Sequence, residues 1–180
     1  MHLIVDNFNN YFFTNKYTCM TTADNFIKLV KHPYKFKLFM LAKLPSAFFC
    51  GVRVKDIDAQ QAIVIVPYKW FSQNPFKSTY FACLAMAAEM STGLLGLMYI
   101  HQRKPAVSML VISLQANYFK KATSITTFIC EDGKAIEATI AAAIESGVGK
   151  SIVAKSVGKD EAGNVIAEFL ITWSFKSKAS

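Results

Sequence analysis

The chain has 180 residues, of which 53% are hydrophobic and 13% aromatic, and its formal net charge is +8. This length suffices for one domain with a sizeable core, and this composition excludes a disordered chain. The excess of basic residues indicates an anionic partner such as nucleic acid, a membrane surface or a phosphate-bearing ligand, or else an ordinary basic surface. Because no run of five basic residues occurs, we expect no nucleic-acid partner.

The N-terminal residues carry no secretory pattern, since polar residues interrupt positions 1–18 and no basic start precedes an apolar run. We expect residues 1–20 to be an extension and residues 21–176 to form a single domain. The four cysteines, Cys19, Cys50, Cys83 and Cys130, are far apart and form no C-x-x-C pair. This spacing predicts free thiols in a reducing cytoplasm, no metal site and no cofactor bound through cysteine.

Helical signals come first along the chain. Thr21 or Thr22 can cap a helix that runs to about Lys31, where His32 and Pro33 end it. A second helix is predicted over residues 34–44, stopping near Pro45.

Strand signals follow these two helices. Residues 52–55 alternate as a half-buried strand does, residues 56–59 indicate a turn, and residues 62–67 are a buried strand. Residues 68–76 are expected to form a loop rich in aromatic side chains.

The stretch after this loop, up to residue 100, is a helix that is apolar on every side and carries one carboxylate, Glu89. A helix without a polar face must be buried. A buried carboxylate is costly unless it is paired or used, and such groups concentrate at functional sites. The helix is long enough to span a bilayer, but Glu89, Ser91, Thr92 and Gly93 at its centre argue against stable membrane insertion.

The second half of the chain is mostly strand. We expect a long, bent strand over residues 107–119, a turn at 120–122, a strand over 124–130 and a turn at 131–134. A short helix over 135–145, a strand over 151–157 and a hairpin loop at 159–164 follow. The closing strand over 165–176 places five side chains on one face: Ala167, Phe169, Ile171, Trp173 and Phe175. The pattern predicts an α+β fold in which an antiparallel sheet curls around one long apolar helix, with extra N-terminal helices.

This layout resembles the hot-dog fold, and residues 74–89 carry the resemblance. Many acyl-CoA thioesterases of this fold show Asn, five residues, His-Gly-Gly, six residues, and then Asp or Glu on the central helix. Asn74 and Glu89 stand at the first and last positions, whereas Tyr80, Phe81 and Ala82 replace His-Gly-Gly. The chain looks most similar to a thioesterase-like branch, the domain-of-unknown-function 4442 group.

The resemblance implies an acyl-CoA thioesterase that needs no cofactor. The N–H of Phe81 or Ala82 would polarise the thioester carbonyl, and Asn74 would orient the water or the carbonyl. Glu89 would act as general base or as nucleophile. Substrate contacts are expected from Tyr80 and, toward the phosphates of CoA, from four basic residues: Arg103, Lys104, Lys120 and Lys121. The resemblance also implies a homodimer whose sites are formed by both chains.

Other interpretations stay open. Side chains in place of His-Gly-Gly could fill the substrate's space, which would make the protein a non-catalytic acyl or lipid binder. A dehydratase would need a histidine beside the acid, and none is suitably spaced. Glu89 could be paired structurally, Asn74 before Pro75 could be a turn residue, and Tyr80 could belong to the core. The four basic residues could simply be solvated loop charges.

Overall fold

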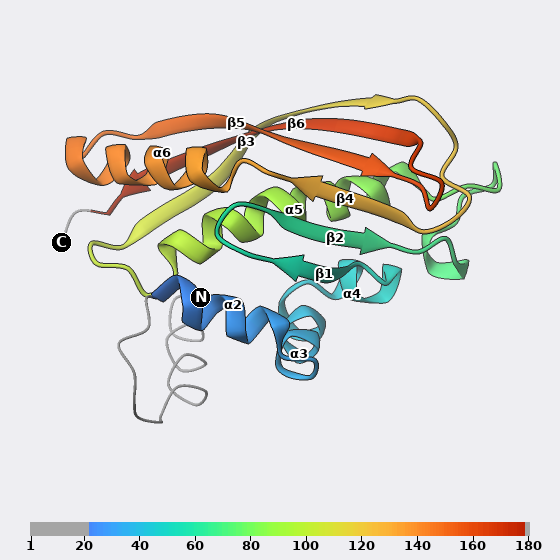
Figure 1. Ribbon diagram of the computed structural model, residues 1–180, viewed down its shortest axis with the longest axis horizontal. Coiled ribbons are helices and arrows are strands. Elements are labelled where there is room, and N and C mark those ends of the chain that lie inside the picture. Colours follow the sequence, from blue (N-terminus) through green and yellow to red (C-terminus); the bar gives the residue numbers. More distant parts are fainter. Residues whose placement is uncertain (1–21, 179–180) are drawn as a thin grey trace.

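The computed structural model describes residues 22–178 as one curved sheet, a central helix and smaller helices around them (Figure 1). The predicted extension, residues 1–20, and Cys19 lie outside the described residues. The helices are α2 (Thr22–Lys31), α3 (Lys35–Lys43), α4 (Pro45–Cys50), the 3₁₀ turn η1 (Trp70–Ser72), α5 (Phe81–Ile100) and α6 (Gly133–Ser146). The strands are β1 (Arg53–Ile57), β2 (Ala62–Val66), β3 (Val107–Tyr118), β4 (Thr126–Cys130), β5 (Lys150–Lys159) and β6 (Val165–Ser177).

The six strands form one antiparallel sheet in the order β1-β2-β4-β5-β6-β3. β3 pairs with β6 along almost its whole length, and its register shifts between Val111 and Ser113. The predicted irregularity in this long strand is therefore confirmed as a β-bulge. β3 is an edge strand, so one of its sides is not paired within the sheet of the described chain.

Helix α5 lies in the hollow of the sheet and contacts every strand (Figure 1). Its Ala, Leu and Met residues favour a helix, and thirteen of its twenty residues are buried, as a core helix requires. Gly96 lets the sheet approach, because a Cβ there would lie 2.7 Å from Met109 Cε. The predicted α+β fold around one apolar helix is confirmed. The prediction that this helix is buried on all sides is wrong, because its Phe81 and Leu97 are exposed.

The core is completed by β6, whose side chains alternate between the two faces of the sheet. Ala167, Phe169, Ile171 and Phe175 are fully buried and Trp173 is 5% exposed, as the alternation predicted. The ring of Phe169 also packs edge-on against Phe128 of β4. This face of β6 thus holds α5 from the side opposite β1 and β2.

Helix α4 differs from the sequence prediction, in which the second helix stops near Pro45 and no helix follows it directly. Proline stands at the first position of this helix, where its missing N–H costs nothing. Gly51 ends it with a φ of +81°, and its N–H bonds to the carbonyl of Phe48 at 3.0 Å. The two residues delimit a six-residue helix that contacts α5 and η1.

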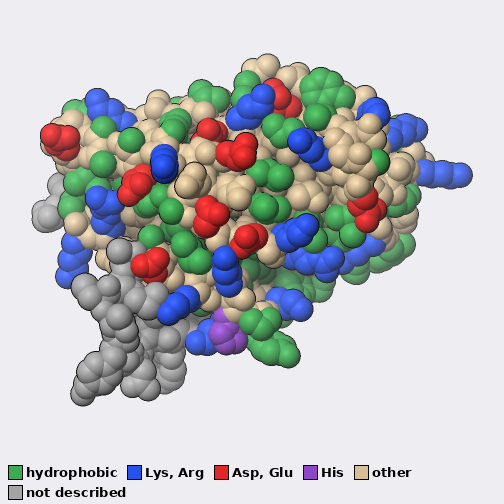
Figure 2. Space-filling model, viewed as in Figure 1, with side chains coloured by type: hydrophobic (Ala, Val, Ile, Leu, Met, Phe, Trp, Pro, Cys, Tyr) green, Lys and Arg blue, Asp and Glu red, His purple; other side chains and the backbone are tan. Residues whose placement is uncertain are grey.

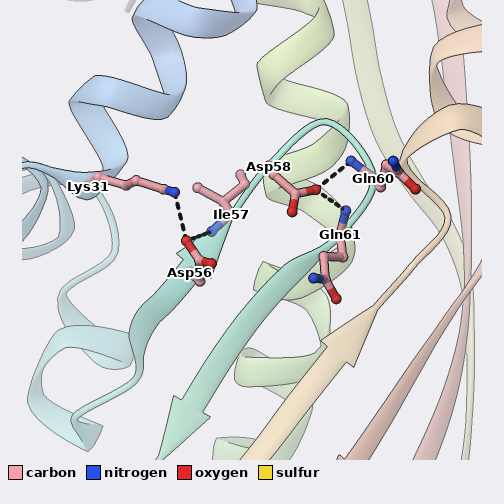
Figure 3. A network of polar contacts seen from close by, with 6 residues as sticks. All are labelled: Lys31, Asp56, Ile57, Asp58, Gln60 and Gln61. Carbon is pink, nitrogen blue, oxygen red and sulfur yellow. Dashed lines mark hydrogen bonds and ion pairs between the residues drawn. The ribbon is translucent and has the colours of Figure 1, made fainter.

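The expected turn at 56–59 is also corrected, because β1 continues through Ile57. Asp56 Oδ1 accepts a hydrogen bond from the Ile57 N–H and an ion pair from Lys31 Nζ at 2.7 Å, which ties α2 to β1 (Figure 3). The turn itself is built by Asp58, whose Oδ1 accepts the N–H groups of Gln60 and Gln61 (Figure 3). The second aspartate, not the first, therefore starts the hairpin.

Within the described part of the chain, α5 is the one helix long and apolar enough to cross a membrane by length and composition. It is mostly buried by the sheet around it, which is the situation of a core helix.

Candidate functional site

Glu89 lies at the middle of α5, on a part of the helix that the sheet does not fully cover. Its side chain is partly buried, and burial raises the pKa of its carboxyl group above the ordinary value of 4.5. No hydrogen bond or ion pair to this carboxylate is found among residues 22–178. A partly buried acid with a raised pKa is suited to take up a proton from a reacting group.

The position of the carboxylate depends on Gly93, one turn further along α5. A Cβ on Gly93 would lie 3.3 Å from Glu89 Oε1 and 3.1 Å from Trp173 Cζ2. The indole of Trp173 is fixed by a 2.9 Å hydrogen bond from its Nε1–H to Thr92 Oγ1. Thr92 Oγ1 in turn donates to the backbone carbonyl of Glu89 at 3.0 Å. Gly93 and Trp173 thus form the wall against which the carboxylate rests.

A small cavity of about 210 Å³ opens beside Glu89. One wall comes from α5 and the other from the α3–α4 corner, and the lining residues are Lys43, Leu44, Pro45, Ser46, Ala47, Met86, Glu89 and Met90. Sites for small molecules usually measure about 300–1,000 Å³. One chain therefore offers a space that is smaller than a complete ligand site.

The N-terminus of α5 is the second chemically distinctive place. Tyr80 precedes the helix in an extended conformation, with φ −62° and ψ 134°, and its carbonyl accepts the N–H groups of Cys83 and Leu84. The N–H groups of Phe81 and Ala82 have no backbone partner in the described chain. Two N–H groups at the positive end of a helix can receive a carbonyl oxygen that gains negative charge.

Two aromatic side chains flank these N–H groups. Tyr80 and Phe81 are 45% and 56% exposed, and their rings meet edge-on with centroids 4.8 Å apart. Tyr80 does not belong to the core of the chain, in contrast to the structural alternative for this residue. Both rings are therefore available for contact with a ligand or with another chain.

Asn74 has a local structural role in the loop before α5. Its Oδ1 accepts the N–H of Phe76 at 2.9 Å and both the N–H and the hydroxyl of Ser78. These bonds use the acceptor side of the amide to hold the loop that delivers Tyr80 to the start of the helix. Any contact of Asn74 with a substrate would have to come from its amide nitrogen.

The predicted basic residues separate into two groups. Lys120 and Lys121 follow β3 and lie near the start of α5, since Thr79 N–H bonds to the Ala122 carbonyl and Lys121 Nζ reaches the Phe76 carbonyl at 3.4 Å. Arg103 and Lys104 follow the other end of α5. One chain therefore brings Tyr80, Phe81, Ala82, Asn74 and Lys121 together but leaves Arg103 and Lys104 about a helix length away.

Glu89 is also separated from the start of the helix. Phe81 and Glu89 are eight residues apart, which is about 12 Å along the helix axis. The carboxylate leans toward Gly93, away from the start of α5, so the side chain does not shorten this distance. A single thioester carbonyl cannot contact the Phe81 N–H and the Glu89 carboxylate of one chain.

The sequence analysis did not predict that the α3–α4 corner, residues 43–47, forms part of the site. Lys43, Leu44, Pro45, Ser46 and Ala47 face Glu89 across the cavity, although they are more than forty residues distant in sequence. Proline at residue 45 and glycine at residue 51 were a usable signal for the short helix. Its position against the acid is a tertiary contact that no local pattern specifies.

The described cysteines have no evident chemical role. Cys50 Sγ and Cys83 Sγ are in contact at 3.4 Å as free thiols, and Cys130 is free as well. Burial raises the pKa of the Cys83 thiol to about 12, which keeps it unreactive near neutral pH. Over residues 22–178, no group of three His, Cys, Asp or Glu side chains gathers as metal ligands would.

Comparison with known proteins identifies the fold. No family model matches the chain, and no curated protein matches it either. Solved structures do match: PA5026 from Pseudomonas aeruginosa, a protein of unknown function, has a TM-score of 0.65 at 18% identity, with 86% of this chain and 95% of that one covered.

Two proteins named as thioesterases are similar as well. A mutant of thioesterase PA1618 from Pseudomonas aeruginosa gives a TM-score of 0.60 at 13% identity, covering 80% of this chain and 94% of its own. Thioesterase HI1161 from Haemophilus influenzae gives 0.53 at 11% identity, covering 91% and 93%. The chain therefore has the hot-dog fold of thioesterase-like proteins. At these identities the similarity concerns the fold, not the activity.

Proposed function

We propose that the protein hydrolyses acyl thioesters such as acyl-CoA, with Glu89 as the catalytic acid–base group. The observation that carries the proposal is the Glu89 carboxylate: it is partly buried, has a raised pKa, lines a cavity and has no partner in the described chain. A structural carboxylate in such a place would be paired. The thioesterase-like fold agrees with this chemistry.

In the proposed reaction, the thioester oxygen is held by the N–H groups of Phe81 and Ala82. Glu89 removes a proton from a water molecule, whose oxygen bonds to the carbonyl carbon. The tetrahedral intermediate collapses by breaking the C–S bond, and the proton passes from Glu89 to the departing thiolate. In the nucleophilic variant of this reaction, Glu89 attacks the carbonyl carbon directly and forms an anhydride that water then cleaves.

The proposed active form is a homodimer, because the reacting groups must come from two chains. A reacting carbon lies about 3 Å from the groups that act on it, whereas Phe81 and Glu89 of one chain are about 12 Å apart along α5. A site that uses the Phe81 N–H of one chain and Glu89 of the other removes this conflict. The partner would also enlarge the 210 Å³ cavity.

The free edge of β3 is the surface that we propose for this pairing. The strand has twelve residues, and its Leu110, Ile112 and Leu114 are 64%, 55% and 46% exposed. An exposed apolar edge of this length is a liability in a monomer and a natural site for pairing with a second copy around a two-fold axis.

The alternative function is the non-catalytic binding of an acyl chain. The exposed rings of Tyr80 and Phe81 favour it, because they flank the N–H groups that would have to reach the carbonyl. Three further points belong to our proposal. We propose that the protein is close to the domain-of-unknown-function 4442 group and that it is located in the cytoplasm. We also propose that four basic residues contact CoA: Lys120, Lys121, Arg103 and Lys104.

A proline at residue 81 tests the role of the N–H group. Position 81 is the first of the helix, where proline is favoured, and the extended conformation of Tyr80 suits a residue that precedes proline. Phe81→Pro should keep the fold and lower kcat about a hundredfold or more. Phe81→Ala, the matched control, keeps the N–H and should retain most of the activity. Equal kcat in the two variants would remove this N–H from the mechanism.

Mixed dimers test the two-chain site. Phe81→Pro and Glu89→Gln chains, each inactive alone, are co-expressed with different affinity tags, and the mixed dimer is purified through both. Each such dimer holds one site with both defects and one with neither, so it should show about half of the wild-type turnover per dimer. No recovery in a purified mixed dimer would contradict a site shared between chains.

A further inference from the structure

Helix α3 carries a second apolar stripe that the core does not use. Phe36 and Met40 face inward and are buried. On the other side, Tyr34, Leu38 and Leu41 are 78%, 51% and 41% exposed. Leu38 and Leu41 are three positions apart on α3, and Tyr34, the N-cap residue, precedes Leu38 by four positions in a helical backbone conformation, so the three residues lie in one line. The helix therefore presents an apolar line to the outside.

Two lysines border this line. At about 100° per residue, Lys35 and Lys37 lie on opposite sides of the stripe that contains Leu38. Both are exposed. Long basic side chains beside an apolar stripe can keep their ammonium groups in water while the leucines enter an apolar phase.

The apolar surface continues from α3 across α4 to the loop around η1. Leu44, which links α3 to α4, is 42% exposed, and Phe49 of α4 is 49% exposed. The Phe49 ring packs on Phe71, with centroids 5.9 Å apart, and Phe71 packs on Trp70 at 4.8 Å. Trp70 is 75% exposed. We call these exposed apolar residues, from Tyr34 through Phe49 to Trp70, the α3–η1 surface.

Basic residues outnumber acidic ones in the segments that form the α3–η1 surface, where Asp56 pairs with Lys31 and Glu89 faces the α3–α4 corner. Residues 25–55 contain no Asp or Glu but seven basic residues, namely Lys28, Lys31, Lys35, Lys37, Lys43, Arg53 and Lys55. Residues 59–88 again contain no acid and add Lys69 and Lys77. In Figure 2, Lys and Arg side chains gather together with apolar ones at the lower right, where Figure 1 draws α3 and α4. The net charge of +8 is thus unevenly placed.

We propose that the α3–η1 surface docks on an anionic lipid bilayer. The leucines and Trp70 would enter the interface, and Lys35, Lys37, Lys69 and Lys77 would meet the lipid headgroups. The aromatic side chains suit the same depth, since Trp and Tyr prefer the boundary between water and hydrocarbon. This is surface binding of a folded protein, and α5 stays in its core.

The charge distribution favours a bilayer over a second copy of the chain. A two-fold contact would bring the same basic surface of each copy together, and like charges across an interface oppose association. An anionic bilayer offers both the opposite charge and an apolar phase. The α3–α4 corner is also a wall of the cavity at Glu89, so docking would bring that cavity to the membrane.

Vesicle binding tests the proposal without reference to hydrolysis. The full chain is mixed with vesicles of phosphatidylcholine alone, or of equal parts phosphatidylcholine and phosphatidylglycerol, and the bound fraction is separated by flotation. Trp70 provides a second readout, because the other tryptophan, Trp173, is 5% exposed. We expect flotation with the anionic vesicles only, a shift of the emission to shorter wavelength, and release at high salt.

Paired variants locate the surface. Lys35→Gln/Lys37→Gln should weaken binding about thirtyfold, since each lysine near an anionic surface contributes about a factor of five. Leu38→Ser/Leu41→Ser should abolish the emission shift. The control Lys134→Gln/Lys150→Gln removes two exposed lysines from α6 and β5 and should bind like the wild type. Circular dichroism and light scattering on each variant check fold and mass.

Three outcomes would overturn the proposal. The first is wild-type protein that stays unbound with anionic vesicles at low salt. The second is an equal loss of binding in the control pair, which would leave only unspecific charge attraction. The third is a halved mass of Leu38→Ser/Leu41→Ser in light scattering, which would assign the surface to contact between copies of the chain.

Discussion

The Glu89→Gln substitution should make the protein more stable, but only at pH values at which Glu89 is ionised in the folded wild type. Glutamine has the shape of glutamate and no charge, so the change removes the cost of holding an ionised group inside the protein. An unpaired buried ion costs several kcal/mol after relaxation. Because Glu89 is only partly buried and borders a cavity, we expect a gain of about 1–2 kcal/mol at pH 7.5. For a chain of this size this is a rise in Tm of about 2–8 °C.

The pH dependence of the gain follows from proton linkage. Burial raises the pKa of Glu89, so the folded state holds the proton more tightly than the unfolded state, whose value is near 4.5. The contribution of Glu89 to wild-type stability therefore falls as the pH rises from about 4.5 through the pKa of Glu89 in the folded state. Below this window Glu89 is protonated in both states and the two proteins should melt alike. Above it, the difference should reach its full size.

The assay is thermal unfolding of wild type and Glu89→Gln at pH values from 4 to 8 in matched salt. Glu145→Gln, which removes an exposed carboxylate from α6, controls for the change in net charge. A lower Tm for Glu89→Gln at pH 7.5, or a difference independent of pH, would refute the reasoning. Either result would mean that the carboxylate has a stabilising partner, for example in a second chain.

Other substitutions test the fold and the site. Gly158→Ala should destabilise the protein by about 2 kcal/mol in urea unfolding, because the new Cβ would lie 2.5 Å from Cε1 of the fully buried Phe128. Gly149→Ala, where the nearest atom is 3.8 Å away, is its control, and equal costs would contradict this packing. Gly93→Ala should raise the activation free energy for kcat by more than it lowers the free energy of unfolding, because its Cβ would press on both Glu89 Oε1 and Trp173. Unchanged kinetics would show that catalysis does not depend on the position of the carboxylate. Ile112→Lys/Leu114→Lys on the edge of β3 should give a monomer near the chain mass of 20.0 kDa in light scattering, and a retained dimer would place the interface elsewhere.

Much of the fold could be predicted because the elements around α5 have strong local patterns. Helix α5 is largely apolar over twenty residues, and β6 alternates from Ala167 to Phe175, so the central position of the helix and the inward face of the strand could be predicted. The β1–β2 turn was misplaced because Asp56 and Asp58 look alike in sequence. The pairing of Asp56 with Ile63 in the sheet, and the bonds from Gln60 and Gln61 to Asp58, show which aspartate belongs to the strand and which to the turn.

The candidate site was less predictable, because it depends on contacts between distant segments. Glu89 could be singled out as a lone acid in an apolar helix. Its neighbours could not be predicted. α4 has six residues, too few for a periodic signal, and the close approach of Trp173 to Gly93, where a Cβ would lie 3.1 Å from Trp173 Cζ2, is a tertiary contact. Asn74 shows the converse, since the fold gives its acceptor atom a loop-building role that the motif alone does not reveal.

The central claim is that the protein hydrolyses a thioester with Glu89 as the catalytic group. The release of CoA tests this claim most directly. Wild type and Glu89→Gln are compared on short-chain, long-chain and aromatic acyl-CoAs. We expect the wild type to turn over at least one of them and the variant to lose about a hundredfold or more of that rate while keeping its fold. Equal turnover by the variant, or binding of acyl-CoA without any release by the wild type, would contradict the claim.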